Sequence, residues 1–152
     1  MKKIIVFLSA CLLISLSNFA QKVAPDKVPA PVKQAFAKKF PTATDVKYEM
    51  EKSDFEINFR DKGVGMSANF DATGKWLETE TEIKESDLPK EVSASVARNF
   101  PGFKITEVAR TEAPGKEPIY ETDVRKGKEG YEVQFTVKGD ILKKIPLKKD
   151  KD

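Results

Sequence analysis

A row of glutamates in one short segment offers the clearest opportunity for chemistry in this chain. Glu78, Glu80 and Glu82 alternate with Thr79 and Thr81, which is the pattern of a β-strand with one charged face. Alternate residues of a strand lie roughly 7 Å apart, whereas a calcium ion needs about six to eight oxygens that converge on one point. A straight row of carboxylates does not converge. We therefore expect a solvated strand face, on which lysines from neighbouring strands pair with the glutamates, and no metal site.

The residue types that most enzymes use for catalysis are missing from the sequence. Its 152 residues include no histidine, and the one cysteine, Cys11, lies close to the N-terminus. Histidine is the commonest general base and a common metal ligand, and a reactive thiolate requires cysteine. The segment from Asp71 to Gly74 is similar to the start of a calcium-binding loop, but turn chemistry explains it fully. We expect no catalytic residue, no cofactor and no enzymatic activity.

The first twenty residues have the pattern of a secretory signal peptide. Two lysines precede an apolar stretch that runs from Ile4 to Ser17, and the small residue Ala20 comes directly before Gln21. This pattern predicts cleavage before Gln21 and a periplasmic or secreted protein with no stable insertion in the membrane. The alternative is a lipid anchor on Cys11, within a lipobox-like sequence. We favour cleavage because the apolar run continues beyond Cys11, whereas a lipoprotein usually turns polar there.

The charge balance argues against nucleic acid as a partner. The full chain has 27 basic and 24 acidic residues, and removal of Lys2 and Lys3 leaves 25 basic and 24 acidic. The two signs are mixed along the chain, whereas nucleic-acid binding needs a basic stripe. Only the charged tail, residues 148–152, is a run of charge.

An internal duplication dominates the rest of the sequence. Val28-Pro29 and Phe40-Pro41 recur 60 residues later as Leu88-Pro89 and Phe100-Pro101. Such a repeat indicates two copies of one structural unit. We assign the first unit to residues 21–84 and the second to residues 85–147.

Each unit is expected to contain one helix followed by four strands. Apolar residues recur at helical spacing before each Phe-Pro pair, and proline ends the helix because it disfavours the α conformation of the preceding residue. The strands that follow alternate apolar and charged residues, which is typical of an antiparallel sheet covered on one side. Because each helix has a single apolar stripe, both helices must pack on the apolar face. The sequence therefore predicts an α+β fold of two tandem αββββ repeats, with both helices on one face of the sheet.

Trp76 is the residue most suited to an interface. Strict alternation would direct it with Glu78 and Glu80, away from the core. Tryptophan on a charged surface is a common interface anchor. In the other interpretation, local twist buries Trp76 as a packing residue. The candidate partner-binding residues on the uncovered face are Trp76, Arg60, Glu78 and Glu80, with Pro114 and Lys116 in the loop 113–118 at its edge.

The motifs of the two units also resemble those of a known family. Val28-Pro29, Phe40-Pro41 and the segment Phe70 to Leu77, echoed by Leu88-Pro89 and Phe100-Pro101, are similar to the exported bacterial PepSY-like, β-lactamase-inhibitor-protein-like (BLIP-like) proteins. The likeness covers nearly the whole chain after residue 20. It implies a periplasmic or secreted domain whose open sheet face binds or inhibits another protein.

These observations lead to one main hypothesis of function and one alternative. The main hypothesis is a non-catalytic exported module that binds an unknown envelope or secreted protein through the open sheet face, with inhibition or regulation of a periplasmic enzyme as the consequence. The alternative is a periplasmic protein that binds a small ligand or a cation.

Overall fold

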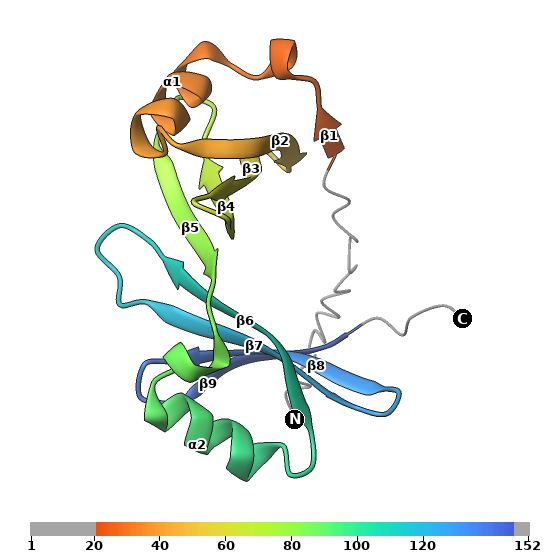
Figure 1. The fold of residues 1–152 in the computed structure, drawn as a ribbon. Helices are drawn as coiled ribbons and strands as arrows, with labels where there is room; N and C mark the ends of the chain where they lie inside the picture. Colours follow the sequence, from red (N-terminus) through yellow and green to blue (C-terminus); the bar gives the residue numbers. More distant parts are fainter. Residues whose placement is uncertain (1–20, 148–152) are drawn as a thin grey trace, which may run out of the picture.

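A computed structural model describes residues 21–147, which form a single antiparallel sheet with two short α-helices (Figure 1). The predicted signal peptide, with Cys11, and the charged tail lie outside the described residues. The strands follow one another across the sheet in chain order. Their bounds are β1 Gln21–Val23, β2 Ala43–Glu51, β3 Asp54–Asp61, β4 Val64–Phe70, β5 Trp76–Glu82, β6 Lys104–Glu112, β7 Ile119–Lys126, β8 Glu129–Thr136 and β9 Ile141–Pro146. The helices are α1 Ala30–Lys39 and α2 Lys90–Asn99, with short 3₁₀ turns η1 Pro25–Lys27 and η2 Glu85–Asp87. No helix within residues 21–147 is long and apolar enough to span a bilayer.

The predicted duplication is confirmed by the order of the elements. Helix α1 with strands β2–β5 forms the first unit, and α2 with β6–β9 forms the second. The units join where Thr79–Glu82 of β5 pair with Ala109–Glu112 of β6. This pairing makes the two predicted αββββ units into one continuous sheet (Figure 1).

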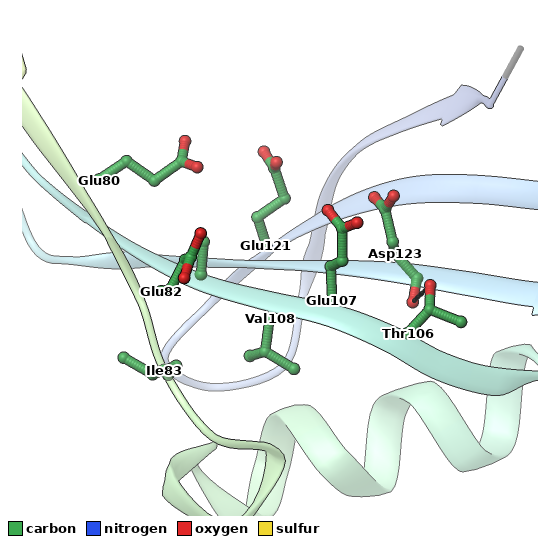
Figure 2. A pocket seen from close by; sticks show the side chains of 9 residues that line it. Glu80, Glu82, Ile83, Thr106, Glu107, Val108, Glu121 and Asp123 are labelled. Atoms are coloured by element: carbon green, nitrogen blue, oxygen red, sulfur yellow. Dashed lines mark hydrogen bonds between the residues drawn. The ribbon is translucent and has the colours of Figure 1, made fainter. Parts of the chain in front are cut away.

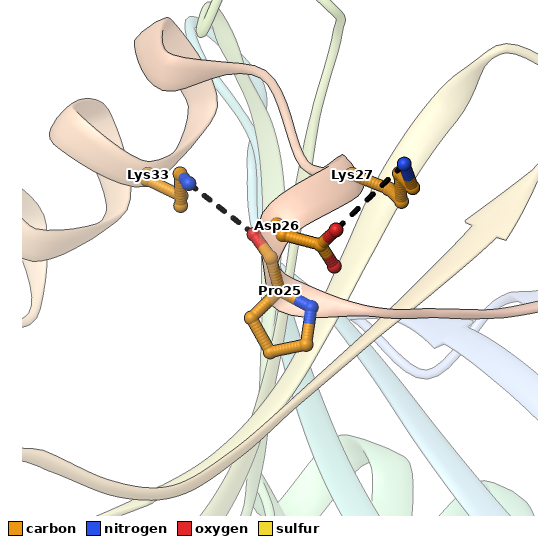
Figure 3. Close-up of polar contacts among 4 residues, drawn as sticks. All are labelled: Pro25, Asp26, Lys27 and Lys33. Atoms are coloured by element: carbon orange, nitrogen blue, oxygen red, sulfur yellow. Dashed lines mark hydrogen bonds and ion pairs between the residues drawn. The ribbon is translucent and has the colours of Figure 1, made fainter.

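Strand β1 was not predicted from the sequence. Its three residues pair with the end of β2, with Gln21 opposite Met50. The turn that follows is tied to the first helix, because Lys33 Nζ donates a hydrogen bond to Pro25 O at 3.2 Å (Figure 3). An exposed ion pair between Asp26 and Lys27 lies in the same turn.

Each unit has its own hydrophobic core under its own helix. In the first, Val32 and Phe36 of α1 are buried against β3 and β4; in the second, Val92 and Val96 of α2 are buried against β7 and β8. The strand residues that are fully buried are Ile57, Ala68 and Phe70 in the first unit and Thr122, Val124, Val133 and Phe135 in the second. The alternation of apolar and charged residues therefore predicted the core-facing sides of these strands correctly.

Both helices lie on the same face of the sheet, as the sequence predicted. Thr81 pairs with core-facing Met66 on one side and with Arg110 on the other, and Arg110 in turn pairs with the buried Tyr120. Directly paired residues of neighbouring strands share a face. The helix-covered face therefore runs without interruption from the first unit into the second.

A glycine turn holds each helix against the sheet. The turn before β5 is closed by a hydrogen bond from Gly74 N to Asp71 O at 2.9 Å, and the turn before β9 by one from Gly139 N to Thr136 O at 2.9 Å. Both glycines have positive φ, +84° and +82°. A Cβ on Gly74 would lie 2.6 Å from Pro31 O, in the first turn of α1, and one on Gly139 would overlap the corresponding carbonyl of α2. The backbone of each turn thus packs directly on the backbone of a helix.

We predict that Gly139→Ala lowers the free energy of unfolding by roughly 2–4 kcal/mol, from the left-handed conformation and the forced displacement of α2. The matched control is Gly115→Ala, whose φ is also positive but whose Cβ would meet nothing within 4 Å. This control should lose only about 1 kcal/mol. Chemical denaturation of both variants measures the difference, and equal losses would show that the contact with the helix contributes nothing.

Candidate functional site

The face of the sheet opposite the two helices is called the open face below. Around β5, β6 and β7 its side chains are mainly acidic. Figure 2 shows Glu80, Glu107 and Glu121 directed to the side away from α2, whereas Ile83 and Val108 are directed towards α2. The cross-strand pairs agree with this view, since Glu107 lies opposite Asp123. Carboxylates from both units therefore meet on one surface.

The first of two hollows on this face lies where β5 meets the second unit, and we call it the acidic hollow (Figure 2). It measures about 430 Å³, and no lysine or arginine lines it. Its acidic lining residues are Glu80, Glu82, Glu107, Glu121 and Asp123, accompanied by Ile83, Thr106, Val108 and Ala109. The wall is fixed in part by Thr106, whose hydroxyl donates to Asp123 O at 3.3 Å.

The second hollow lies on the other side of β5 and has mixed charge, so we call it the mixed hollow. It measures about 390 Å³ and shares Glu80 and Glu82 with the acidic hollow. Lys47 and Arg60 line it together with Glu56. Arg60 is held by its own hairpin, because its Nη1 donates to Gly63 O at 2.8 Å. Strand β5 is thus a ridge of carboxylates between two hollows.

Gly65 makes room for one of these carboxylates. It lies on β4 in the mixed hollow, and a Cβ at this position would overlap the carboxyl group of Glu82. The side chain of Glu82 therefore lies across the strand in the space that the absent Cβ leaves. A glycine in a strand interior often marks such a close approach.

Burial and like charge together perturb the ionisation of the open face. Glu80 has its pKa raised from 4.5 to about 7, first by burial and then by repulsion from Glu121, Glu56, Glu78 and Glu132. The pKa of Asp123 is also raised, chiefly by burial and then by Glu107 and Glu121, although Arg125 opposes the shift. The pKa of Glu132 is raised by burial and Glu121, while Lys143 lowers it. The carboxylates of several strands therefore repel one another through a partly water-excluded surface.

The expectation that neighbouring lysines pair with the glutamate row is wrong. On β4 the residues opposite Glu78 and Glu80 are Asn69 and Ser67, and Asn69 Nδ2 donates to Glu78 Oε1 at 3.0 Å. On β6 the residues opposite Glu80 and Glu82 are Thr111 and Ala109. The adjacent strands thus supply neutral partners at these positions, and sequence alternation could not reveal which residues would be opposite.

Of the two interpretations of Trp76, the packing one is correct, and strict alternation misplaces this residue. The register shifts between Asn69 and Phe70, so Trp76 lies opposite Phe70 and packs against the first core. Its Nε1 donates to Thr79 Oγ1 at 2.9 Å, and Lys39 Nζ lies 3.7 Å from the centre of its ring. A bulge reverses the alternation locally. The packing interpretation therefore describes Trp76, which lies on the helix-covered face.

The structure brings together only part of the predicted partner-binding set. Arg60 and Glu80 both line the mixed hollow, and Glu78 lies on the same face. Pro114 and Lys116 are exposed in the loop between β6 and β7, where Lys116 N donates to Ala113 O at 3.2 Å, and they line neither hollow.

Sequence reasoning missed the contribution of the second unit to this surface. Glu107, Glu121 and Asp123 were not among the candidates, yet they line the acidic hollow. A signal was present, since Glu121 and Asp123 alternate with the buried Tyr120 and Thr122. What the sequence could not supply was the pairing of β5 with β6, which places these residues beside Glu80.

The turn at Asp71 has the structural role that the sequence indicated. The Asp71 carboxylate accepts hydrogen bonds from Thr73 N at 2.8 Å and Lys75 N at 3.1 Å. Hydrogen bonds from Thr73 and Lys75 lower the pKa of this carboxyl group. Within residues 21–147 no group of three or more acidic side chains is placed to hold a metal ion.

Comparison with protein families gives a match over most of the chain. Residues 15–67 and 58–143 each match the family described as beta-lactamase-inhibitor-like and PepSY-like. The two matches overlap within β3 and β4 and together extend over both units of the sheet. No curated protein matches the sequence.

Solved structures from Bacteroides species share the fold. A Bacteroides eggerthii protein described as periplasmic has a TM-score of 0.74 at 24% identity, over 78% of this chain and 88% of its own. A DUF2874 family protein from Bacteroides uniformis has a TM-score of 0.72 at 24% identity, and the alignment covers 78% of this chain and 88% of that protein. A BLIP-like protein from Bacteroides fragilis has a TM-score of 0.67 at 23% identity, and the alignment covers 82% of this chain and 90% of that protein. Identities this low indicate a shared fold and carry no information about activity.

We predict that Glu80→Gln removes part of the pH dependence of stability. Because folding raises the pKa of Glu80 from 4.5 to about 7, the folded state binds the proton more tightly and loses stability as the pH rises through this interval. The neutral glutamine should therefore stabilise the protein at pH 8 by about 1–2 kcal/mol, with little effect at pH 4.

Urea denaturation at both pH values measures this difference. The control is Glu117→Gln, the same change at an exposed position in the loop between β6 and β7. A uniform effect of Glu80→Gln at the two pH values would contradict the assignment of the repulsion to this carboxyl group.

Proposed function

Because the chain belongs to the beta-lactamase-inhibitor-like, PepSY-like family, we propose that it is an exported, non-catalytic domain that binds another protein through the open face. The observation that carries the proposal is the position of both helices on one side of a sheet that runs through both units. The other side is left as a broad polar surface with two hollows. A sheet face of this extent is large enough for a protein partner.

Export and lack of catalysis have separate support. The N-terminal pattern up to Ala20 is that of a signal peptide, and a solved structure with the same fold is described as periplasmic. The sequence contains no histidine, and Cys11 lies in the segment that would be removed. We propose a periplasmic location with cleavage before Gln21. Inhibition or regulation of an envelope enzyme is the consequence of binding that the family description favours.

We predict that a photo-crosslinker on the open face captures a partner in cells. The photo-reactive residue would replace Asn58 on β3 or Thr111 on β6, both half-buried on the open face. Matched controls replace Ala37 on α1 or Ala94 on α2, which are exposed on the helix-covered side. The expected result is one crosslinked protein, identified by mass spectrometry, from both open-face positions and from neither control.

Two outcomes would contradict the proposed binding through the open face. Capture of the same protein from the helix positions alone would place the interface on the other side of the sheet. The proposed function would be rejected if the open-face positions gave no specific crosslinked product in cells and none in purified envelope fractions.

A further inference from the structure

The charge on the open face is concentrated where the two units meet. Strand β5 contributes Glu80 and Glu82, β6 contributes Glu107, and β7 contributes Glu121 and Asp123. These residues come from segments that are separated in sequence, and the pairing of β5 with β6 brings them together. The acidic hollow is therefore a product of the assembled sheet and not of one charged segment.

Positive groups offset the charge of these carboxylates only in part, since burial and like charge still raise the pKa of Asp123 although Arg125 lowers it. Gln134 Nε2 donates to Glu121 Oε2 at 2.8 Å, which satisfies an oxygen without neutralising it. The nearest arginine of β6, Arg110, pairs instead with Glu112 at 2.8 Å, on the strand that bears Glu107. Arg110 belongs to the helix-covered face, because it lies opposite Tyr120. Lys47 and Arg60, two other cations of the open face, line the mixed hollow on the far side of β5. Arg125 and Lys143 lie nearer to the second unit's carboxylates, where they lower the pKa values of Asp123 and Glu132 respectively.

The raised pKa values show that this arrangement costs free energy in the free protein. Glu80 repels and is repelled by carboxylates on β3, β7 and β8 as well as by its own neighbour Glu78. A positively charged group placed in the acidic hollow would reverse this penalty. Charge complementarity therefore selects a cationic occupant and opposes an anionic one, such as nucleic acid or an acidic membrane surface.

The spread of the carboxylates favours an extended occupant over a metal ion. Neighbouring strands are roughly 4.8 Å apart, so carboxylates on β5 and β7 are separated by about 10 Å along the sheet. Alternate side chains of an extended peptide lie about 7 Å apart, and the long aliphatic stems of lysine and arginine can cover the difference between this spacing and the separation of the carboxylates. The described residues contain no group of three or more acidic side chains that could hold a metal ion.

We propose that the open face docks a lysine- or arginine-rich segment of the partner protein, whose cationic side chains occupy the acidic hollow beside β5. This inference rests on the proposed function and adds the chemistry of the partner. The carboxylates of Glu80 and Glu121 are the principal contacts. Strand β5 orients the segment, because one of its sides is acidic and the other carries Lys47 and Arg60.

The test uses the mature chain and a synthetic eight-residue peptide with lysine at alternate positions. Titration calorimetry at low salt should give saturable binding, and the same peptide with glutamate in place of lysine should not bind. The double variant Glu80→Gln with Glu121→Gln should weaken binding at least tenfold, because two contacts lose their charge. The double variant Glu85→Gln with Glu117→Gln, which removes the same charge from exposed positions off the open face, should change it less than twofold.

Two further conditions separate charge pairing from other modes of binding. Binding should weaken several-fold as salt rises from about 50 to 300 mM, because added ions screen the attraction. It should also weaken as the pH falls from 8 to 5.5, since Glu80 then takes up a proton while Glu56, Glu78, Glu121 and Glu132 surround it. The thermal unfolding of each variant shows that it is folded.

The outcomes that overturn the inference differ from those that overturn the proposed function. Equal affinities of the two double variants, or no binding of the lysine peptide by the wild-type chain, would reject the acidic hollow as the docking site. If calcium alone bound saturably, and the double variant Glu80→Gln with Glu121→Gln lost this binding, the occupant of the acidic hollow would be a metal ion and not a peptide. A partner crosslinked from Thr111 through a segment without lysine or arginine would also reject the inference while leaving the proposed function intact.

Discussion

The contact between a turn and the first turn of a helix, made once in each unit, is the constraint on which the arrangement of this protein depends. Gly74 and Gly139 have no Cβ. The turn that contains each glycine can therefore lie directly against the backbone of a helix, where a Cβ would clash. The same contact occurs on the same side of the sheet in both units. Because it fixes where α1 and α2 lie, it also decides which face of nine strands remains uncovered.

The uncovered face follows from the pairing of β5 with β6 more than from any single residue. The first unit carries Glu78, Glu80 and Glu82 on its last strand, and the second carries Glu121 and Asp123 on β7. Because β5 and β6 are joined through four residue pairs, these two groups of carboxylates lie on either side of β6. The raised pKa of Glu80 is a consequence of this junction. After burial, the largest causes of the shift are repulsion from Glu121 of the second unit and from Glu56 of the first.

The sequence predicted the architecture well because the relevant signals are local and repeated. The Phe-Pro pairs end both helices at Phe40 and Phe100, and the alternation in β3 and β7 places Ile57 and Val124 in the cores. The short strand β1 was missed because three residues carry no usable period. Its existence depends on pairing with the end of β2.

The candidate site was predicted less completely, for reasons of register. Alternation placed Glu78 and Glu80 correctly but failed at Trp76, where a shift in pairing beside Phe70 reverses the face. It also gave no indication that Glu121 would come near Glu80, because contacts between strands of different units depend on how the units join. Local patterns determine which side of its own strand a residue occupies, and the assembled sheet determines its neighbours across strands.

Within residues 21–147, β9 is an edge strand of the sheet, and it differs from its counterpart β5 in the first unit. Thr81 of β5 pairs with Met66 of its own unit and with Arg110 of the second unit. The residue of β9 equivalent to Thr81 is Pro146, which pairs with Tyr131. Proline has no N–H to offer a further strand, and the adjacent Lys143 and Lys144 place charge along the same border. A strand of a neighbouring molecule would find an incomplete set of hydrogen-bonding groups there. The edge formed by β9 therefore opposes association of two molecules through this strand.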